Sequence, residues 1–460
     1  MSEQPLTVAI QIGAVSFHDE GIEPLLDLLQ EKGAVNALFL ATPTWTRGTG
    51  GRQVPGHPLP DHGVQEYDLD WVGGNYAQMR PEYYRGTFLG PVGRAQEHGD
   101  WDLFEAVLPA AQERGMRSFA WMEESYYAHV RHLPNFVKVS EIDVDGKRTH
   151  TSCMNHPDYR NWWLSILEDY VRSYRLDGIA FCSERTGPLA SLLSGSGYTG
   201  CFCNFCRRLA RERGVRVERV QAGVRALRDW MREDSPSDGK FVTAWRLLLE
   251  YPDLLGWERH WAESQRSLYR EIYGAVKSIR GDLLVGWHIH HGNSFNPFYR
   301  ATQDYADLRN YSDFIKVVSY HNCAGPRFAR YVRGIGRAFL GDHPEQANTE
   351  WLYRVLGYDG TQPPYEELSA RGFNAEYVRR ETLRALRGVG ASVMIWPGID
   401  IDIPTGENEA RCTPESVGAA VRAALEAGAQ GVVLSRKYSE MRLDNLEGAG
   451  RAVREFLANR

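Results

Sequence analysis

Eight short apolar runs recur along this chain of 460 residues, and most are bounded by Gly, Asp or Pro. Continuous runs of this length, rich in Val, Ile, Leu, Phe and Ala, are typical of parallel β-strands that are buried on both faces. The runs begin at Thr7, Val35, Arg117, Asp177, Leu283, Asp313, Ala391 and Gly431. The chain is therefore limited to folds that bury a parallel sheet, which favours the α/β class.

Stretches with a helical period separate these runs. Examples cover residues 21–34, 101–116, 159–175, 258–280 and 414–429. Strand and helix alternating eight times predict a single (β/α)8 TIM barrel. No Pro/Ser-rich linker, low-complexity tract or short repeat divides the sequence, so we expect residues 1–460 to form one barrel domain.

Four intervals between the predicted strands are much longer than a loop and a helix require. They cover residues 46–100, 125–157, 185–240 and 322–390. Insertions in this fold normally lie at the C-terminal face of the barrel, where active sites are built. The first interval is rich in Gly, Pro, Tyr and Trp, a composition that suits walls around a sugar ring.

The composition excludes several classes of protein. A hydrophobic content of 43% excludes a disordered chain, and 53 Lys and Arg against 59 Asp and Glu leave no basic excess for nucleic acid. No segment approaches the ~18 to 20 apolar residues that cross a bilayer, and the N-terminus lacks the pattern of a secretory signal. We therefore expect a soluble, cytoplasmic protein without nucleic-acid or membrane partners. A homo-oligomer stays open, because no segment marks an interface.

Polar residues directly after the strands are the candidate catalytic residues of a barrel. The candidates are His18, Asp19, Thr44, Trp45, Glu123, Glu124, Ser183, Glu184, Arg185, His288, His290, His291, Asn293, Tyr320, His321, Asn322, Trp396, Asp400, Asp402, Ser435, Arg436, Lys437 and Tyr438. Indoles stack on the CH faces of sugars, and carboxylates supply acid/base catalysis. Their combination on one rim favours a carbohydrate site.

Glu184 follows a buried run and precedes Gly187 and Pro188, which break the chain. We expect aromatic walls to desolvate this carboxyl and raise its pKa, so that it protonates a glycosidic oxygen near neutral pH. A structural surface contact between Glu184 and Arg185 is the alternative.

Three of the seven cysteines are close in sequence. Cys201, Cys203 and Cys206 have the spacing C-x-C-x2-C, which suits one tetrahedral Zn²⁺. Cys153 and Cys182 are both candidates for the fourth ligand. Because four thiolates leave no open position, such a zinc would brace a loop and take no part in catalysis.

His288 and His290 share one face of a strand, because side chains alternate along it. This placement allows a second metal site or an imidazole acid/base, and hydrogen bonds to a sugar are the alternative.

The segments TSCMNHPDYRNWW, DGIAFCSERTG and CFCNFCRRLA resemble the glycoside hydrolase family 42 β-galactosidases and related uncharacterised barrel hydrolases. The resemblance covers residues 151–210. It implies that Cys153, Cys201, Cys203 and Cys206 bind a structural zinc ion. It also implies that Glu184 is the general acid/base.

The chain departs from that family at two positions. Ser183 stands where the family has an Asn before its acid/base, and the segment MIWPGIDIDIP contains no Glu for the family's nucleophile. We therefore expect Asp400 to be the nucleophile or base, with Glu124, Asp402 and Asp19 as further candidates.

These observations predict a glycoside hydrolase that cleaves a small glycoside or oligosaccharide. Its predicted sugar subsite contains Trp45, Arg185, His288, His290, Tyr320, Asn322 and Trp396. One alternative is an inverting, sialidase-like barrel hydrolase that uses Asp19 and a histidine such as His132, with Arg185 or Arg436 binding a substrate carboxylate. The other is a sugar-binding barrel without catalytic activity.

Overall fold

The structure is a computed structural model that describes residues 5–44, 49–124, 132–234 and 236–460. Its parallel strands form one sheet in the order β10-β11-β1-β2-β3-β6-β7-β8-β9. The strands are β1 (Thr7–Gly13), β2 (Ala37–Ala41), β3 (Arg117–Glu123), β6 (Gly178–Cys182), β7 (Leu284–Ile289), β8 (Phe314–Val317), β9 (Met394–Ile395), β10 (Gly398–Asp400) and β11 (Gly431–Ser435).

The sheet closes into a barrel because β9 and β10 are two pieces of one strand position. Trp396 and Pro397 separate the two pieces, β9 pairs with β8, and β10 pairs with β11. The eight predicted runs supply these eight strand positions. The predicted TIM-barrel fold is therefore confirmed.

The barrel interior is filled by aromatic and small side chains from alternate strand positions. The rings of Phe39, Phe119, Phe314 and Trp396 pack against one another there. Side chains of the same parity that lie further along the strands face the open C-terminal end of the barrel. This alternation decides which rim residues enter the mouth.

The first strand is shorter than the sequence suggests. It ends at Gly13, and α1 (Ala14–Glu20) follows it directly, with Phe17 buried. The prediction that His18 and Asp19 follow a strand is therefore wrong, because they lie in the last turn of this helix. The apolar residues after Gly13 are buried on a helix face and not in the sheet.

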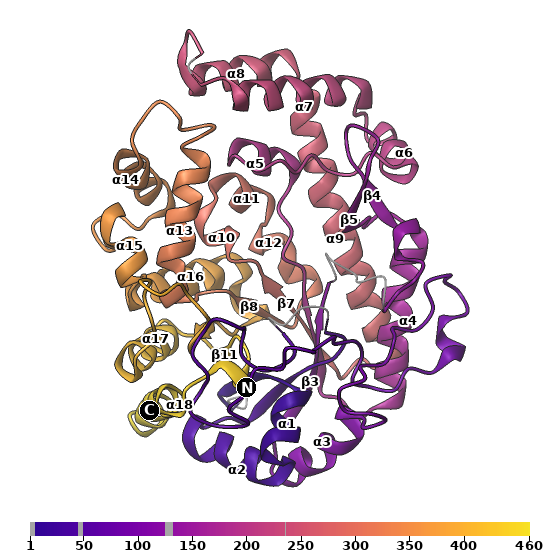
Figure 1. Ribbon diagram of the computed structural model, residues 1–460, viewed down its shortest axis with the longest axis vertical. Coiled ribbons are helices and arrows are strands. Elements are labelled where there is room, and N and C mark those ends of the chain that lie inside the picture. The colour runs from indigo at the N-terminus through magenta and orange to yellow at the C-terminus, as the bar shows by residue number, and fades with distance from the viewer. Residues whose placement is uncertain (1–4, 45–48, 125–131, 235) are drawn as a thin grey trace.

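Helices surround the barrel (Figure 1). The outer helices are α2 (Ile22–Gly33), α3 (Leu103–Glu113), α4 (Pro157–Ser173), α9 (Asp253–Ile279), α12 (Tyr305–Leu308), α16 (Ala375–Val389), α17 (Pro414–Glu426) and α18 (Leu443–Ala458). Helix α18 packs against α2 and α17, so the last helix lies beside the first outer one. Within the described ranges, no helix is long and apolar enough to cross a membrane.

The long intervals all leave the C-terminal ends of strands. The second carries the antiparallel pair β4 (Ser140–Ile142) and β5 (Arg148–Ser152). The other helices that overlap these intervals are α5 (Pro188–Leu193), α6 (Asn204–Glu212), α7 (Val217–Arg232), α8 (Gly239–Glu250), α13 (His321–Ile335), α14 (Glu345–Leu356) and α15 (Tyr365–Arg371). Two short helices, α10 (Gly292–Phe295) and α11 (Pro297–Thr302), follow β7 outside them. Figure 1 shows α7 and α8 at the end of the molecule opposite α2.

Candidate active site

Two carboxylates from neighbouring strands face the mouth of the barrel. Glu123 is the last residue of β3, and its register partner on β6 is Cys182. Glu184 lies two residues beyond Cys182 and shares its parity. With strands ~4.8 Å apart and a rise of ~3.3 Å per residue, the two α-carbons are about 8 Å apart. This arrangement places both acids on one side of the mouth.

Glu184 is open to solvent on one side and hydrogen-bonded on the other. Its side chain is 35% exposed, and its Oε1 lies 3.0 Å from Nε2 of His288. Burial raises the pKa of Glu184, but the hydrogen bond from His288 and the electrostatic effects of His290, His288 and Arg327 outweigh burial and hold the pKa below its ordinary value. The predicted rise in this pKa is therefore wrong, because the sequence did not place these imidazole and guanidinium groups beside the carboxyl.

Glu123 has the opposite behaviour. Burial and the negative charge of Glu184 raise its pKa to about 7, although a hydrogen bond with Thr49 and the charges of Arg436 and Lys316 act against this rise. A carboxyl with this pKa keeps a large protonated fraction at neutral pH. Glu184 is ionised under the same conditions, so the two acids differ in charge.

His288 is neutral beside the ionised Glu184. Burial and the neighbouring Lys316 cation lower the pKa of His288 to about 4, although its hydrogen bond to Glu184 raises it. An ionised carboxylate only accepts hydrogen bonds, so Nε2 of His288 carries the proton and donates it to Glu184. His288 thus orients the carboxylate without neutralising its charge.

A buried lysine forms the floor of the mouth. Lys316 is the register partner of His288, and its ammonium donates to Gln11 Oε1 and, over 2.9 Å, to the hydroxyl of Tyr320. It also lies 4.7 Å from the ring centre of Trp121. Burial lowers the pKa of Lys316 to about 7. Substrate atoms that reach this depth would meet a hydrogen-bond donor close to the two acids.

Glu124 and Arg185 point away from the mouth, because each is one residue out of phase with the inward-facing acids. Arg185 Nη2 lies 2.7 Å from Glu124 Oε1, and Tyr159 donates to the same oxygen over 2.8 Å. Both members of this ion pair are buried, and Arg185 also donates to the carbonyl of Ser152 over 2.6 Å. The pair connects the ends of β3 and β6 to β5.

Asp400 is fully buried, and backbone groups occupy both of its oxygens. Cys323 N–H donates to one oxygen over 2.9 Å, and Ile403 N–H donates to the other over 2.8 Å. Burial raises the pKa of Asp400 to about 6. Asp402 has φ +92 and accepts hydrogen bonds from Arg442 and Asn445. These contacts give both aspartates a part in holding the loop after β10.

The other predicted residues are divided between the mouth and the core. Tyr320 is 3% exposed and contacts Lys316, and His290 lies near Glu184, whose pKa it lowers. Trp396 is fully buried below the mouth, where it stacks on Phe314 with 4.2 Å between the ring centres, so it belongs to the barrel core. Trp45 lies outside the described residues.

The residues of the alternative, sialidase-like mechanism form hydrogen bonds and ion pairs with other protein groups. The carboxylate of Asp19 pairs with Arg52 through two hydrogen bonds of 2.8 and 2.7 Å. His132 is 5% exposed and bonds through Nε2 to the carbonyl of Val72. Arg436 pairs with Glu440. Asn322 lies elsewhere on the C-terminal face and lines a cavity.

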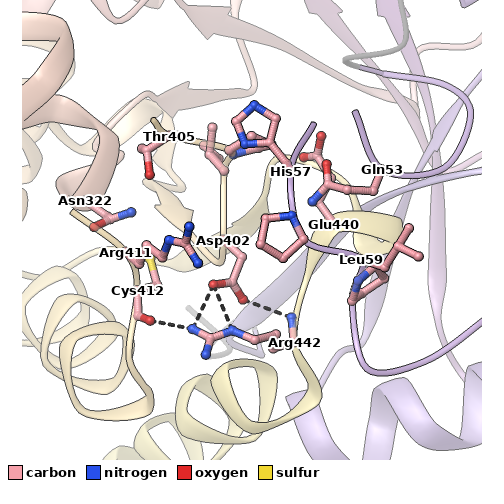
Figure 2. A pocket seen from close by; sticks show the side chains of 14 residues that line it. Gln53, His57, Leu59, Asn322, Asp402, Thr405, Arg411, Cys412, Glu440 and Arg442 are labelled. Carbon is pink, nitrogen blue, oxygen red and sulfur yellow. Dashed lines mark hydrogen bonds and ion pairs between the residues drawn. The ribbon is translucent and has the colours of Figure 1, made fainter. Parts of the chain in front are cut away.

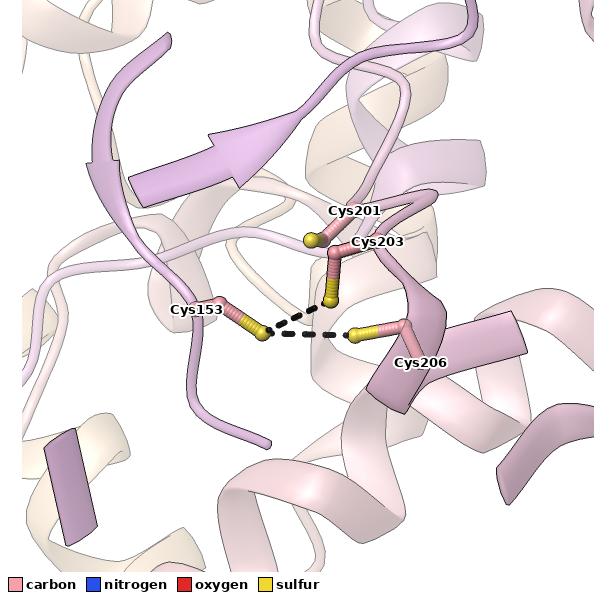
Figure 3. Close-up of side chains that lie close together, drawn as sticks. All are labelled: Cys153, Cys201, Cys203 and Cys206. Carbon is pink, nitrogen blue, oxygen red and sulfur yellow. Dashed lines mark hydrogen bonds between the residues drawn. The ribbon is translucent and has the colours of Figure 1, made fainter. Parts of the chain in front are cut away.

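Four buried cysteines lie together, and they join two of the long intervals (Figure 3). Cys153 follows β5, whereas Cys201, Cys203 and Cys206 lie at the start of α6. Cys153 Sγ lies 3.5 Å from the Sγ atoms of Cys203 and Cys206, and all four sulfur atoms lie within 4.8 Å of one another. The four-cysteine group therefore forms a candidate metal centre.

A second group, Cys182, Glu184 and His288, also has its ligand atoms within 4.8 Å of one another. Here the acid/base arrangement fits better than a metal, because the Lys316 ammonium lies on the same layer of the barrel and His288 is neutral and donates to Glu184. A cation in this group would be repelled by that ammonium.

Two residues of the mouth, Glu123 and Lys316, are not singled out by the sequence alone. Glu123 is one of the polar residues after the strands, but the sequence favours Glu124 as a candidate for the second catalytic residue. Lys316 is a charged residue inside the apolar run that begins at Asp313, and this placement is itself a signal of an inward-facing polar group. Counting positions from Phe119 and Trp121 shows that Glu123 shares their inward parity.

No protein-family model matches the chain, and a search of curated proteins found no match. Among solved structures, it is similar to the PgaB (BpsB) glycoside hydrolase domain from Bordetella bronchiseptica, with 13% identity and a TM-score of 0.53 over 98% of each chain. The β-galactosidase of the haloarchaeon Halorubrum lacusprofundi is 14% identical, with a TM-score of 0.56 over 99% of this chain and 58% of that one. The β-galactosidase of Marinomonas ef1 is 11% identical, with a TM-score of 0.51 over 98% and 60%. The chain thus spans less than two thirds of either β-galactosidase. At these identities the likeness shows a common barrel fold.

Proposed function

We propose that the protein is a glycoside hydrolase in which Glu123 is the general acid and Glu184 is the nucleophile or base. One observation carries this proposal: two acids share the mouth of the barrel, and their surroundings move their pKa values in opposite directions. Such a pair allows one carboxyl to donate a proton while the other stays ionised at the same pH. The glycoside hydrolase names of the structural neighbours agree with this function.

The reaction follows from the charge states of the two acids. Protonated Glu123 donates its proton to the glycosidic oxygen as the bond to the sugar breaks. Ionised Glu184, oriented by His288, either attacks the anomeric carbon or activates a water molecule that attacks this carbon. In the first case water then hydrolyses the glycosyl ester, with Glu123 taking the proton from that water, so that both acids return to their starting states. Carboxyl groups about 5 to 5.5 Å apart would retain the anomeric configuration, whereas about 6.5 to 9.5 Å would invert it.

This assignment differs from the one implied by the sequence resemblance. That resemblance assigns the acid/base role to Glu184, and we expected Asp400 to be the nucleophile or base because the family's Glu is missing here. The low pKa of Glu184 favours an ionised role instead, and Asp400 is occupied by backbone N–H groups. We therefore propose Glu123 as its partner, with a small β-galactoside-like glycoside as the substrate class suggested by the resemblance.

The proposed role of the four-cysteine group is to bind a structural zinc ion. Four thiolates around Zn²⁺ with bonds of ~2.3 Å give sulfur separations of about 3.8 Å, close to the 3.5 Å between Cys153 and two of its partners. The donor set is complete, so the metal would have no open position for substrate. It would tie the end of β5 to the start of α6.

A panel of aryl glycosides tests the hydrolase. We expect the wild-type protein to hydrolyse at least one member. Glu184→Gln should lower kcat/KM by at least about 10³, because it removes the ionised carboxylate that acts as nucleophile or base. Circular dichroism should show a folded variant, since Glu184 is partly exposed. Normal activity of this variant would remove the assignment. Saturable sugar binding without hydrolysis would favour the sugar-binding alternative.

A further inference from the structure

A cavity of about 110 Å³ is lined by residues that follow the C-terminal ends of strands, as the two acids do. Figure 2 shows the side chains that line it. Its wall is formed by the loop after β10, the first turn of α13, the segment after β2 and the 3-10 turn Tyr438–Glu440. This volume holds several water-sized groups, which is enough for a carboxylate and part of the sugar ring that bears it.

The hydrogen-bond acceptors in the wall already have partners within the protein. Both oxygens of Asp402 accept from Asn445 over 2.8 Å, and Arg442 N–H adds a bond of 2.9 Å. Glu440 accepts from Arg436 over 3.1 Å, and Lys437 lies 3.8 Å away. The wall therefore has little acceptor capacity left for a ligand.

Two donors of the wall, Asn322 and Arg411, are in the opposite condition. Asn322 is 5% exposed, and within the described part of the chain its Nδ2 has no hydrogen-bond partner. Figure 2 shows Asn322 at the edge of the cavity, with Arg411 beside it. Arg411 is exposed and forms no ion pair with any described carboxylate. A buried amide without a partner carries a desolvation penalty that a bound acceptor would relieve.

The charges around the cavity favour an anion. Arg411, Arg442, Arg436 and Lys437 supply four positive charges, against the carboxylates of Asp402, Glu440 and the nearby Asp400. Guanidinium groups bind carboxylates through paired N–H donors, and an amide N–H₂ adds another donor.

Helix α13 contains a residue that lines the cavity and a residue whose charge acts on Glu184. Asn322 is on the first turn of this helix, and Cys323 N–H binds Asp400. Arg327, further along the same helix, acts on the pKa values of both Glu184 and Asp400. Asn322 and Glu184 follow the C-terminal ends of β8 and β6, so the cavity and the acids share this face of the barrel.

We propose that this cavity, lined by Asn322 and Arg411, binds the carboxylate of an acidic sugar unit in the substrate. The proposal deepens the proposed hydrolase function and rests on it. The substrate class becomes glycosides that contain a uronic acid, and Arg411 becomes a residue that determines specificity.

Direct binding measurements test the proposal without requiring hydrolysis. D-glucuronate, D-galacturonate, D-glucose, D-galactose and acetate are titrated by calorimetry into the wild-type protein, Arg411→Gln, Asn322→Asp and the control Arg337→Gln. Arg337 is likewise exposed and forms no ion pair among the described residues, but it lies outside the cavity. The Asn322→Asp change keeps the shape of the side chain and places a negative charge against the ligand.

We expect each uronate to bind wild type at least about 10-fold more tightly than its neutral counterpart, as one charge-assisted hydrogen bond would provide. Arg411→Gln should bring this ratio close to one, Asn322→Asp should lower it, and Arg337→Gln should preserve it. Equal binding of uronates and neutral sugars, no binding of uronates, or an unchanged ratio in Arg411→Gln would overturn the proposal. Acetate binding as tightly as the uronates would assign the cavity to a free anion and overturn the substrate assignment. If the protein binds uronates but hydrolyses no glycoside, the proposed hydrolase function is refuted and the uronate-binding cavity is not.

Discussion

Replacing Glu123 by Gln should stabilise the protein while it removes acid catalysis. Burial and the charge of Glu184 raise the pKa of Glu123 from 4.5 to about 7. At about 1.4 kcal/mol per pKa unit, an ionised Glu123 destabilises the folded state by at most about 3 kcal/mol. The variant lacks this charge, so the gain measures the destabilisation that the site imposes on the fold.

The sign of the effect depends on pH. Below about pH 4.5 the carboxyl is protonated in both the folded and the unfolded state, so Glu123 causes no loss. Between about pH 4.5 and 7 the unfolded state loses this proton while the folded state keeps it, so stability falls as the pH rises and levels off above about pH 7. We therefore expect the free energy of unfolding of Glu123→Gln to be higher than that of wild type, by under about 1 kcal/mol at pH 5 and by about 3 kcal/mol at pH 8.

Glu124→Gln is the matched control, because it makes the same chemical change one residue further along. Its carboxylate is buried against Arg185, and the change leaves that cation with a weaker partner, Glu141 at 3.5 Å. We expect a destabilisation of about 3 to 5 kcal/mol at both pH values. Neighbouring residues would thus give stability changes of opposite sign.

Urea unfolding at pH 5 and pH 8 measures the stabilities, and two substrates measure the chemistry. Glu123→Gln should slow hydrolysis of a methyl glycoside by about 10² to 10⁴, but should slow a dinitrophenyl glycoside far less, because that leaving group needs little protonation. Glu124→Gln should slow both equally. The reasoning would be refuted if the stability gain of Glu123→Gln were the same at both pH values. It would also be refuted if Glu124→Gln, and not Glu123→Gln, slowed the methyl glycoside more than the dinitrophenyl glycoside.

Two further predictions concern His288 and the cysteines. His288→Leu removes the donor that helps to hold down the pKa of Glu184, so the acidic limb of the kcat/KM profile should move to higher pH; an unmoved limb would contradict this role. Elemental analysis should find one zinc per chain, lost with a lower Tm in Cys206→Ser and kept in the control Cys412→Ser, a buried cysteine outside the group. Metal-free wild-type protein of undiminished Tm would argue against a structural zinc.

The position of the four cysteines shows how far spacing in sequence can go. The C-x-C-x2-C motif predicts three ligands close together, and the structure brings Cys153, about 50 residues earlier, next to them. From the residues alone Cys182 is the other candidate, although its place on a barrel strand favours a small core side chain. The fold separates the two, because Cys182 lies on β6 inside the barrel whereas Cys153 follows β5 in an interval outside it.

The sequence alone determined the barrel and the edge that bears the site. Eight apolar runs separated by helical stretches are buried on both faces only in a parallel sheet covered by helices, and the polar residues after them must share its C-terminal edge. Such runs are apolar on both faces, so composition does not reveal which face is inside the barrel. Tertiary packing decided that Glu123 enters the mouth and Glu124 does not. It also decided the charge of Glu184, because His288 and Arg327 reach that carboxyl from distant parts of the chain.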